Sequence, residues 1–446
     1  MSKALHELSA IEAATEIRAG RLLSEALVGA CLDRISETDE SIRAWTFVDR
    51  EMALAQANEA DRIRRSGRAT GALHGVPVGL KDIVDTKDMP TQLGSEIFAG
   101  RQPDRDAAVV NRLREAGAVI LGKTKTTEFA FVHPADTSNP HEGTRTPGGS
   151  SSGSAAAVAA HQVPLAIGTQ TNGSVLRPAS FCGIYGFKPT RGMISRSGIL
   201  QTSASLDQVG AFGRSIEDVA LLCDVLCGYD PDDPASFARP RPGMLAGARA
   251  EPPVEPAIAW LDLPHHERLD DDARAGFESV IEAMGGRIER STAAPQLAAL
   301  IEVHRKIHEY EFCQHLAEVI AQHGSRLSAS LQPVVARGQE ISRTEYEDAL
   351  AVKESAEQFF STYFHDFDAI MAPAATGEAP AMAAGGTGDP VFCTIWTLAG
   401  LPAITLPILV GHNGLPVGIQ LVGGSEEDDR LLRTASWFQT ELARQV

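Results

Sequence analysis

Short apolar runs alternate with helical patterns between residue 73 and about residue 230. The apolar runs lie at residues 76–80, 118–121 and 165–167. The helical patterns lie at residues 107–116, 154–160 and 216–226. A chain that alternates strands and helices packs its helices against a sheet, so this pattern predicts an α/β core with a mixed sheet.

The rest of the chain extends this core at both ends. Apolar spacing predicts helices over residues 5–66, a Pro- and Gly-rich connection over 231–256 and a mainly helical stretch over 269–365. Short apolar segments return at residues 369–371, 403–406 and 417–422. We therefore expect one domain over residues 1–446 with a helical insertion. Its parts are N-terminal helices at 1–70, the core at 71–230, the helical region at 265–365, and a C-terminal sheet and helix at 366–446.

The composition narrows the class of protein. Hydrophobic residues make up 43% of the 446 residues and charged residues 22%, which is typical of a globular chain. The net charge of −18 argues against a nucleic-acid partner, because phosphate binding needs clustered Lys and Arg. The sequence shows no signal-peptide pattern and no apolar stretch of about 18 residues, so we expect a cytoplasmic protein without a membrane partner. The six cysteines have no disulfide-framework spacing.

Two serine-containing loops and one lysine segment stand out within the core. Ser150 lies in the first loop, Gly148-Gly149-Ser150-Ser151-Ser152-Gly153-Ser154, and Ser174 lies in the second, 168–178. Lys81 lies upstream, in the segment 75–82. Serine is a weak nucleophile until a base removes its proton, and glycine-flanked turns expose N–H groups that hold an oxyanion. The three segments therefore contain the parts of an acyl-transfer site in which a neutral lysine replaces histidine.

Both loops have the character of anion-binding turns. The first runs directly into the alanine-rich segment 155–160, a strong helix former, so it predicts a turn at a helix N-terminus. The free N–H groups and the dipole of a helix N-terminus favour negative charge. In the second loop Asn172 and Gly173 tolerate positive φ, which lets consecutive N–H groups converge on an anion.

One segment matches the phosphate-binding loop pattern of nucleotide-binding proteins. This segment is Gly117-Ala118-Val119-Ile120-Leu121-Gly122-Lys123-Thr124. A phosphate-binding loop follows a strand and opens a helix. Here the middle residues have the character of the strand itself, so a P-loop nucleotide-binding protein remains only a remote alternative.

Two further motifs have simpler interpretations. Gly149 to Gly153 matches the nucleophile elbow, which would make Ser151 the nucleophile, but a loop rather than a strand precedes it. His304 and His308 have the spacing of a zinc protease pair. Arg305 stands where that chemistry needs Glu, so a packed helix face is the better interpretation.

The order and spacing of the serine and lysine segments resemble the amidase signature family. The likeness covers nearly the whole chain and weakens over about residues 265–365. It implies a large mixed, twisted sheet flanked by helices on both faces, with a helical insertion. The shared motifs are the lysine segment at 75–82, Gly122-Lys123-Thr124, Glu128-Phe129, the Pro-Gly-Gly-Ser-Ser run at 147–151, 173–178, 181–190, Pro373, Gly400-Leu401-Pro402 and 414–420.

The resemblance implies a Ser–cis-Ser–Lys triad and no cofactor or metal. Ser174 would be the nucleophile, Ser150, preceded by a cis peptide bond, the bridging serine, and Lys81 the base. Ser151 would support this network by hydrogen bonds. The oxyanion hole would be formed by the backbone N–H groups of Thr171, Asn172, Gly173 and Ser174.

The base implied by this resemblance places a demand on its surroundings. Lys81 must be neutral, so its pKa must fall well below the usual value of about 10.4. Burial among Val76, Val78 and Leu80 lowers the pKa of an amine. A carboxylate has the opposite effect, so we expect Asp82 to point away from Lys81.

Three residues set this chain apart or bear on its substrate. Ser152 and Asn172 stand where many family members have glycine, and the motifs look most like the bacterial malonamidase-like branch. Asn172 would contact substrate or limit its size. Arg177 has two interpretations, a partner for a substrate carboxylate as in that branch, or a structural ion pair with a core acid.

The function implied is hydrolysis of a linear C–N amide, through an acyl-enzyme, on a small molecule. Malonamate-like acids, carboxybiuret-type ureas, aryl amides, carbamates and urethanes all remain open as substrates. An A-type subunit of a glutamine-dependent tRNA amidotransferase is the alternative, and a homodimer is also open. The helical region is expected to line the pocket through His304, His308, Tyr310 and Phe312.

Overall fold

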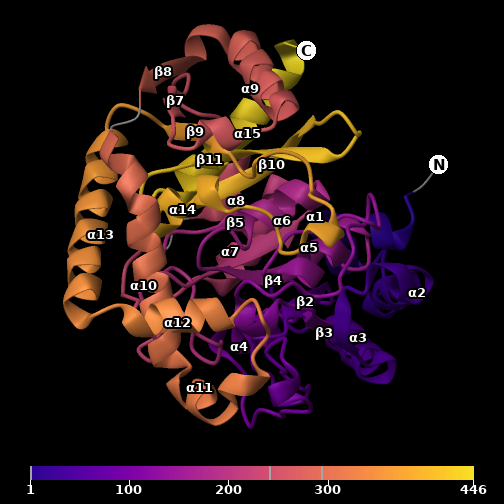
Figure 1. Cartoon of the computed structure of the whole chain (residues 1–446). Coiled ribbons are helices and arrows are strands. Elements are labelled where there is room, and N and C mark those ends of the chain that lie inside the picture. The colour runs from indigo at the N-terminus through magenta and orange to yellow at the C-terminus, as the bar shows by residue number, and fades with distance from the viewer. Residues whose placement is uncertain (1–2, 241–242, 293–294, 446) are drawn as a thin grey trace.

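A computed structural model describes residues 3–240, 243–292 and 295–445 of the chain (Figure 1). Within these ranges the strands form one sheet in the order β1-β3-β2-β4-β6-β5-β10-β11-β9-β7-β8. The strands are β1 (Trp45–Val48), β2 (Pro77–Lys81), β3 (Val119–Thr124), β4 (Leu165–Gln170), β5 (Tyr185–Lys188), β6 (Gln208–Gly213), β7 (Ile258–Asp262), β8 (Ile288–Thr292), β9 (Ala369–Pro373), β10 (Ala403–Val410) and β11 (Pro416–Val422).

The sheet is mixed, as the sequence predicts. β2 pairs in parallel with β3 and β4, and β7 pairs in parallel with β8 and β9. The other neighbours are antiparallel, including β10 between β5 and β11. Strands from the C-terminal part of the chain therefore complete the sheet that the core begins.

Helices cover both faces of this sheet. A Cβ added to Gly210 of β6 would lie 2.9 Å from Val175, at the start of α6, whereas one added to Gly213 would lie 2.7 Å from Asp218 of α7. Successive side chains of a strand point to opposite faces, and these two positions differ by an odd number. Helices α6 and α7 thus pack on opposite faces, which confirms the predicted fold class.

The α-helices of the described ranges vary from one and a half turns to nearly six. They are α1 (Ala10–Arg18), α2 (Ser24–Ile42), α3 (Arg50–Arg65), α4 (Ala108–Glu115), α5 (Ser152–Ala159), α6 (Leu176–Cys182), α7 (Ile216–Leu226), α8 (Met244–Arg249), α9 (Asp271–Met284), α10 (Ala299–His315), α11 (Ala317–His323), α12 (Gln332–Glu340), α13 (Arg343–Tyr363), α14 (Val391–Leu398) and α15 (Asp428–Gln445).

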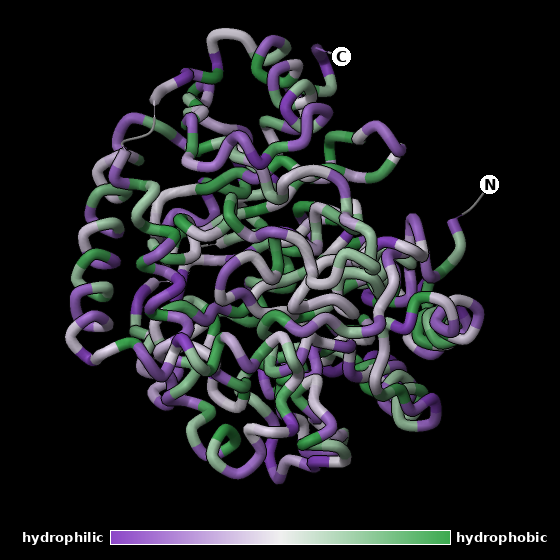
Figure 2. The backbone as a smooth tube through the Cα atoms, in the orientation of Figure 1, coloured by the Kyte–Doolittle hydropathy of each residue, from purple (hydrophilic) through white to green (hydrophobic). Residues whose placement is uncertain are grey.

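Helices α10 to α13 form a layer beside the sheet, at the left and lower left of Figure 1. Hydrophilic and hydrophobic residues alternate along α13, whereas hydrophobic residues gather along the central strands (Figure 2). The buried side of the layer includes Ile307 and Phe360, and the Phe360 ring meets Trp396 of α14 edge-on at 5.3 Å between centroids. The helical layer therefore packs against α14.

Several strands lie where the sequence pattern predicts none. β1 interrupts the stretch 5–66 that was predicted to be helical, and β7 and β8 join the sheet although both precede residue 366. β8 is an edge strand in which only Ile288 is buried, so it carries no alternating apolar pattern. β5 and β6 contain the glycines Gly186, Gly210 and Gly213, which weaken a strand signal.

Candidate active site

Lys81 is the last residue of β2 and its side chain is fully buried. Its Nζ donates hydrogen bonds to Ser150 Oγ at 2.7 Å and to Thr169 Oγ1 at 2.8 Å. Burial lowers the pKa of Lys81 to about 7, against an opposing effect of Asp207. A large fraction of the amine is therefore neutral near pH 7 and able to accept a proton.

Asp82 turns away from Lys81, as expected from the sequence. Its carboxylate accepts hydrogen bonds from the Gln92 N–H at 3.1 and 3.2 Å. Burial raises the pKa of Asp82 to about 6, while Lys123 counteracts this rise. The carboxylate thus belongs to the surroundings of Lys123.

The first serine loop places Ser150 beside Lys81 at the entrance to α5. The peptide bond between Gly149 and Ser150 is cis, as the family resemblance implies, and Ser150 O accepts a hydrogen bond from Thr127 N at 3.2 Å. Ser151 is the N-cap residue of α5, and its hydroxyl contacts the carbonyl and the N–H of Thr169, both at 3.3 Å. Ser151 therefore links this loop to the end of β4, next to Lys81.

The second serine loop connects β4 to α6. The Gln170 side chain accepts hydrogen bonds from the N–H groups of Val175 at 2.9 Å and Leu176 at 3.0 Å, which fixes the start of α6. Ser174 lies inside this turn and is 8% exposed. Its hydroxyl makes no hydrogen bond to any described residue, so the structure joins Lys81 to Ser150 without a bond from Ser150 to Ser174.

The predicted oxyanion-hole residues follow β4 directly. The N–H groups of Thr171, Asn172, Gly173 and Ser174 lie outside the helices and strands and donate to no acceptor in the described part of the chain. A Cβ at Gly173 would lie 3.0 Å from Pro390 and 3.3 Å from Cys393, so the turn packs closely against α14 and its N-terminus. Such N–H groups at a helix N-terminus are suited to hold an oxyanion.

A cavity of about 380 Å³ opens onto the second loop. Its walls include Thr171, Asn172, Ser174 and Arg177 from the loop and α6, Phe131 from the segment after β3, His304 and His308 from α10, and Thr387 to Thr394 in part. The Asn172 side chain is held at this wall, because its Oδ1 accepts a hydrogen bond from Thr394 Oγ1 at 2.7 Å. A small organic molecule fits a cavity of this size.

Arg177 is the charged group at the cavity wall with the least satisfied side chain. It is 5% exposed, and its Nη2 donates to Gly149 O at 2.7 Å and to Thr387 Oγ1 at 3.0 Å. Nε and Nη1 are buried and have no hydrogen-bond partner within residues 3–240, 243–292 and 295–445. Burial lowers the pKa of Arg177 to about 10, against smaller opposing effects of Cys393 and Asp389, and no described carboxylate lies within ion-pair distance of its guanidinium.

The helical region contributes part of what the sequence predicted. His304 and His308, one turn apart on α10, line the cavity, and the His308 ring lies 4.2 Å from the Phe131 ring. Tyr310 and Phe312 do not line it: Tyr310 stacks on Tyr346, and Phe312 packs behind Phe131. Tyr310 lies on another face of α10, whereas Phe312 shares the face of His308 but lies one turn further along the helix, where its ring packs on Phe131.

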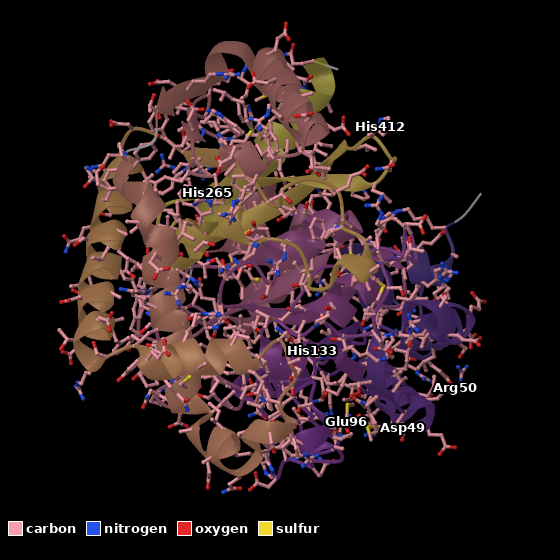
Figure 3. The ribbon with its side chains drawn as sticks, in the orientation of Figure 1. Asp49, Arg50, Glu96, His133, His265 and His412 are labelled. Carbon is pink, nitrogen blue, oxygen red and sulfur yellow. The ribbon has the colours of Figure 1, made fainter. Side chains whose placement is uncertain are left out.

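The wall formed by Phe131 is tied to the helical layer at its outer end. His133, labelled in Figure 3, lies close to the loop before α12, and its Nδ1 is 3.0 Å from Ser330 Oγ. Glu128 accepts a hydrogen bond from the Ser328 N–H at 3.1 Å. These contacts hold the segment after β3 against α12 on one side of the cavity.

Several site residues were not predicted from the sequence. Thr169 lies within the second loop motif and could have been found there, since it directly follows Gly168. Phe131, Thr387 and Thr394 come from distant segments and have no local motif. Lys123 belongs to β3 itself, where its Nζ donates to Val84 O at 2.5 Å and Thr91 Oγ1 at 2.6 Å. The segment around it is therefore a strand and not a phosphate-binding loop.

Two further findings concern the described residues as a whole. No helix among them is both long and apolar enough to cross a membrane. No group of three or more His, Cys, Asp and Glu side chains in these ranges is arranged to hold a metal ion.

Comparison with known proteins identifies the family. The model of the family described as Amidase matches residues 26–432. The chain belongs to the amidase signature family. The A-type subunit of the glutamyl-tRNA(Gln) amidotransferase of Natranaerobius thermophilus is 33% identical to this amidase-family chain, over 97% of it and 95% of the relative.

Solved structures agree with this assignment over nearly the full chain. A chain from a vestigial protein complex that bears on the evolutionary origins of an s-triazine catabolic enzyme is 28% identical, with a TM-score of 0.91, and the match covers 97% of this chain and 98% of that one. The native peptide amidase of Stenotrophomonas maltophilia is 29% identical, with a TM-score of 0.83, and the match covers 98% and 97%. This amidase-family protein is thus an enzyme that acts on C–N amide bonds.

Proposed function

We propose that the protein hydrolyses a small amide through an acyl-enzyme formed on Ser174. The observation that carries this proposal is the fully buried Lys81 amine, 2.7 Å from Ser150 Oγ and with no described carboxylate bonded to it. An amine with a pKa of about 7 in that position can take a proton from a hydroxyl. Ser174 lies on the cavity, where a substrate carbonyl has access to it.

The reaction then follows from the order of these groups. Ser174 Oγ attacks the amide carbon while its proton passes to Ser150, whose own proton passes to Lys81. The tetrahedral oxyanion accepts hydrogen bonds from the N–H groups of the second serine loop. The C–N bond breaks as the proton returns through Ser150 to the leaving nitrogen, and water then hydrolyses the Ser174 ester by the same route. The missing hydrogen bond between Ser150 and Ser174 forms in this scheme when substrate is bound, since catalytic hydrogen bonds often tighten only in the complex.

Replacing the nucleophile tests this proposal. Ser174→Ala should abolish hydrolysis of every amide that the wild-type protein cleaves, measured as product release by mass spectrometry. Ser436→Ala on α15 is the matched control, because that hydroxyl bonds to Ala248 O, far from the serine loops in the chain. Retention of hydrolysis by Ser174→Ala would contradict the proposal.

The substrate class is proposed from Arg177. Two of its buried nitrogens face no acceptor in the described structure, and a guanidinium N–H forms a strong, charge-assisted hydrogen bond to a carboxylate. We infer that the substrate carries a carboxylate near the scissile amide. Since no described core acid is bonded to Arg177, the structural ion-pair interpretation loses its main support.

A panel of substrates tests this inference. It contains carboxylated amides, carboxybiuret-type ureas, neutral aryl amides and urethanes, each assayed with the wild type and Arg177→Ala. We expect kcat/KM to fall about 10²-fold for the carboxylated compounds, a loss of about 3 kcal/mol of charge-assisted hydrogen bonding. An equal loss for the neutral compounds would show that Arg177 only supports the loop through Gly149 and Thr387.

A second candidate is an amidotransferase A-type subunit. It is favoured by the relatives of that name, which match at 33–35% identity over most of their length. Purification from the native cell should then bring two partner subunits with the chain and reveal glutaminase activity. An independent hydrolase would purify alone, either as the 47.5 kDa chain or as a homodimer of twice that mass.

A further inference from the structure

Three carbonyl groups of the second serine loop each accept a hydrogen bond from a neighbouring donor. The three bonds are His304 Nε2 to Thr171 O at 2.8 Å, Thr397 Oγ1 to Asn172 O at 2.5 Å, and Arg177 N to Gly173 O at 3.0 Å. All three lie in the stretch whose N–H groups are proposed to receive the oxyanion. Each bond therefore acts on the same peptide units that supply the N–H donors.

Holding a carbonyl also aims the next N–H group. A trans peptide unit is planar, and its C=O and N–H point in opposite directions. The only cis peptide bond in the described ranges precedes Ser150, so the peptide units of this loop are trans. The bond from His304 to Thr171 O thus turns the Asn172 N–H to the side opposite His304.

His304 differs from the other two donors in its origin. Arg177 belongs to α6, which the loop itself begins, and Thr397 belongs to α14 and also bonds the Gln170 side chain. His304 belongs to α10, 133 residues away from Thr171 in the chain. This hydrogen bond joins the helical layer to the proposed oxyanion loop.

The chemistry of this contact assigns the histidine proton. A carbonyl oxygen only accepts, so His304 Nε2 must carry a hydrogen. The ring is 2% exposed, and burial lowers its pKa to about 4, so it is a neutral donor near neutral pH. Ile307 on the same helix is fully buried, so its packing holds α10 against the interior of the protein.

We propose that His304 is a positioning residue for the oxyanion hole: its hydrogen bond to Thr171 O orients the peptide unit that presents the Asn172 N–H. This inference deepens the proposed function and rests on it. His304 contacts none of the reacting atoms in this scheme. It acts on the transition state through the peptide unit between Thr171 and Asn172. A side chain of the helical region thereby influences the rate of the chemical step.

Two substitutions at this position separate hydrogen bonding from packing. His304→Leu keeps a side chain of similar bulk and removes the donor, while His304→Gln supplies an amide N–H of similar reach. Ile307→Val is the matched control, because it loosens the same helix without touching the loop. Each variant is assayed for kcat and KM on the best substrate of the panel, for melting temperature, and for the rate at which a fluorophosphonate labels Ser174.

We expect His304→Leu to lower kcat by about 10- to 100-fold with KM changed less than about threefold, since a complete loss of one oxyanion donor costs about 10²–10³. The labelling rate should fall in parallel, because the probe also develops charge on an oxygen. His304→Gln should recover to within about fivefold of the wild type. Ile307→Val should lower the melting temperature and leave kcat per labelled Ser174 unchanged.

The outcomes distinguish the two proposals. If wild-type protein hydrolyses amides and His304→Leu matches it in kcat and labelling, the inference about His304 is wrong while the proposed function stands. Equal losses in His304→Leu and His304→Gln, or a change in KM alone, would also overturn the inference. A wild-type protein that neither cleaves an amide nor labels at Ser174 would overturn the proposed function and this inference with it.

Discussion

Strands β2 and β3 each bury one lysine, and the two lysines lie on opposite faces of the sheet. The register pairs Lys81 with Thr124 and Leu80 with Lys123. Because side chains alternate along a strand, Lys81 and Lys123 point in opposite directions although their strands are neighbours. Both amines are fully buried, and burial lowers the pKa of Lys81 to about 7 and that of Lys123 to about 8.

The two lysines differ in what their partners can give. Lys81 meets the hydroxyl of Ser150, and a hydroxyl has a proton to pass to a neutral amine. Lys123 meets the carbonyl of Val84 and the hydroxyl of Thr91, whose proton is directed to that same carbonyl. Burial therefore lowers the pKa of both amines. Only Lys81, on the side of the sheet with the serine loops, contacts a hydroxyl that can pass it a proton.

The largest expected effect separates the two faces directly. Lys81→Met should lower kcat/KM by about 10²- to 10⁴-fold, the usual contribution of a general base. Lys123→Met should leave kcat of the folded fraction within about threefold. Both are measured on the same panel substrate at equal concentrations of folded protein, determined by absorbance and circular dichroism. Similar losses in the two variants would remove the distinction between the faces.

The pH profile is the next test. Lys81 acts in its neutral form, which dominates above its pKa and is lost below it. We therefore expect kcat/KM to be level above about pH 7 and to fall about tenfold per unit below it, in an assay between about pH 5 and pH 9. Lys123→Met should keep the same midpoint. A profile that is level down to about pH 5 would contradict the assignment of Lys81 as the base.

Lys123→Met should affect the stability of the protein although it leaves kcat nearly unchanged. Lys123→Met leaves Val84 O without its buried lysine donor and removes the cation facing Asp82, so the free energy of unfolding should fall by about 1–3 kcal/mol. Urea unfolding followed by circular dichroism measures the change. Lys87→Met, at a lysine whose side chain is 61% exposed, serves as the control and should differ from wild type by less than about 0.5 kcal/mol.

The smallest effect concerns the second partner of Lys81. Thr169→Val removes the hydroxyl that accepts from Nζ and keeps a β-branched side chain suited to β4. A loss of about 1 kcal/mol, or roughly fivefold in kcat/KM, is expected. Thr169→Ser keeps the hydroxyl and should stay near wild type, and equal losses in the two variants would point to packing instead.

Local sequence was enough to predict which segments the fold brings together around Lys81. The apolar runs at 76–80, 118–121 and 165–167 correspond to β2, β3 and β4. One serine loop directly precedes α5, and the other connects β4 to α6. Glycine-rich turns followed by helix formers are local signals, so they can be recognised in a single sequence. The buried Lys81 also followed from its apolar neighbours alone.

The substrate side of the cavity depends on contacts that have no local signal. Thr387 meets Arg177 across 210 residues of sequence, and a sequence taken alone offers no reason to pair them. The face of α10 was predictable in principle, since His304 and His308 share it and Tyr310 does not. Edge strand β8 was not predicted, because a strand with one buried residue has the same hydropathy pattern as a surface loop.

The position of β10 has a consequence for how the protein is made. β5 pairs with β6 on one side and with β10, which begins at Ala403, on the other. A ribosome that has already synthesised both serine loops must still deliver Thr397 and β10 before Asn172 O gains its donor and β5 its second neighbour. A nascent chain thus carries its proposed nucleophile and base well before its sheet is complete, and we expect a chain that ends before β10 to contain both serine loops and to lack activity.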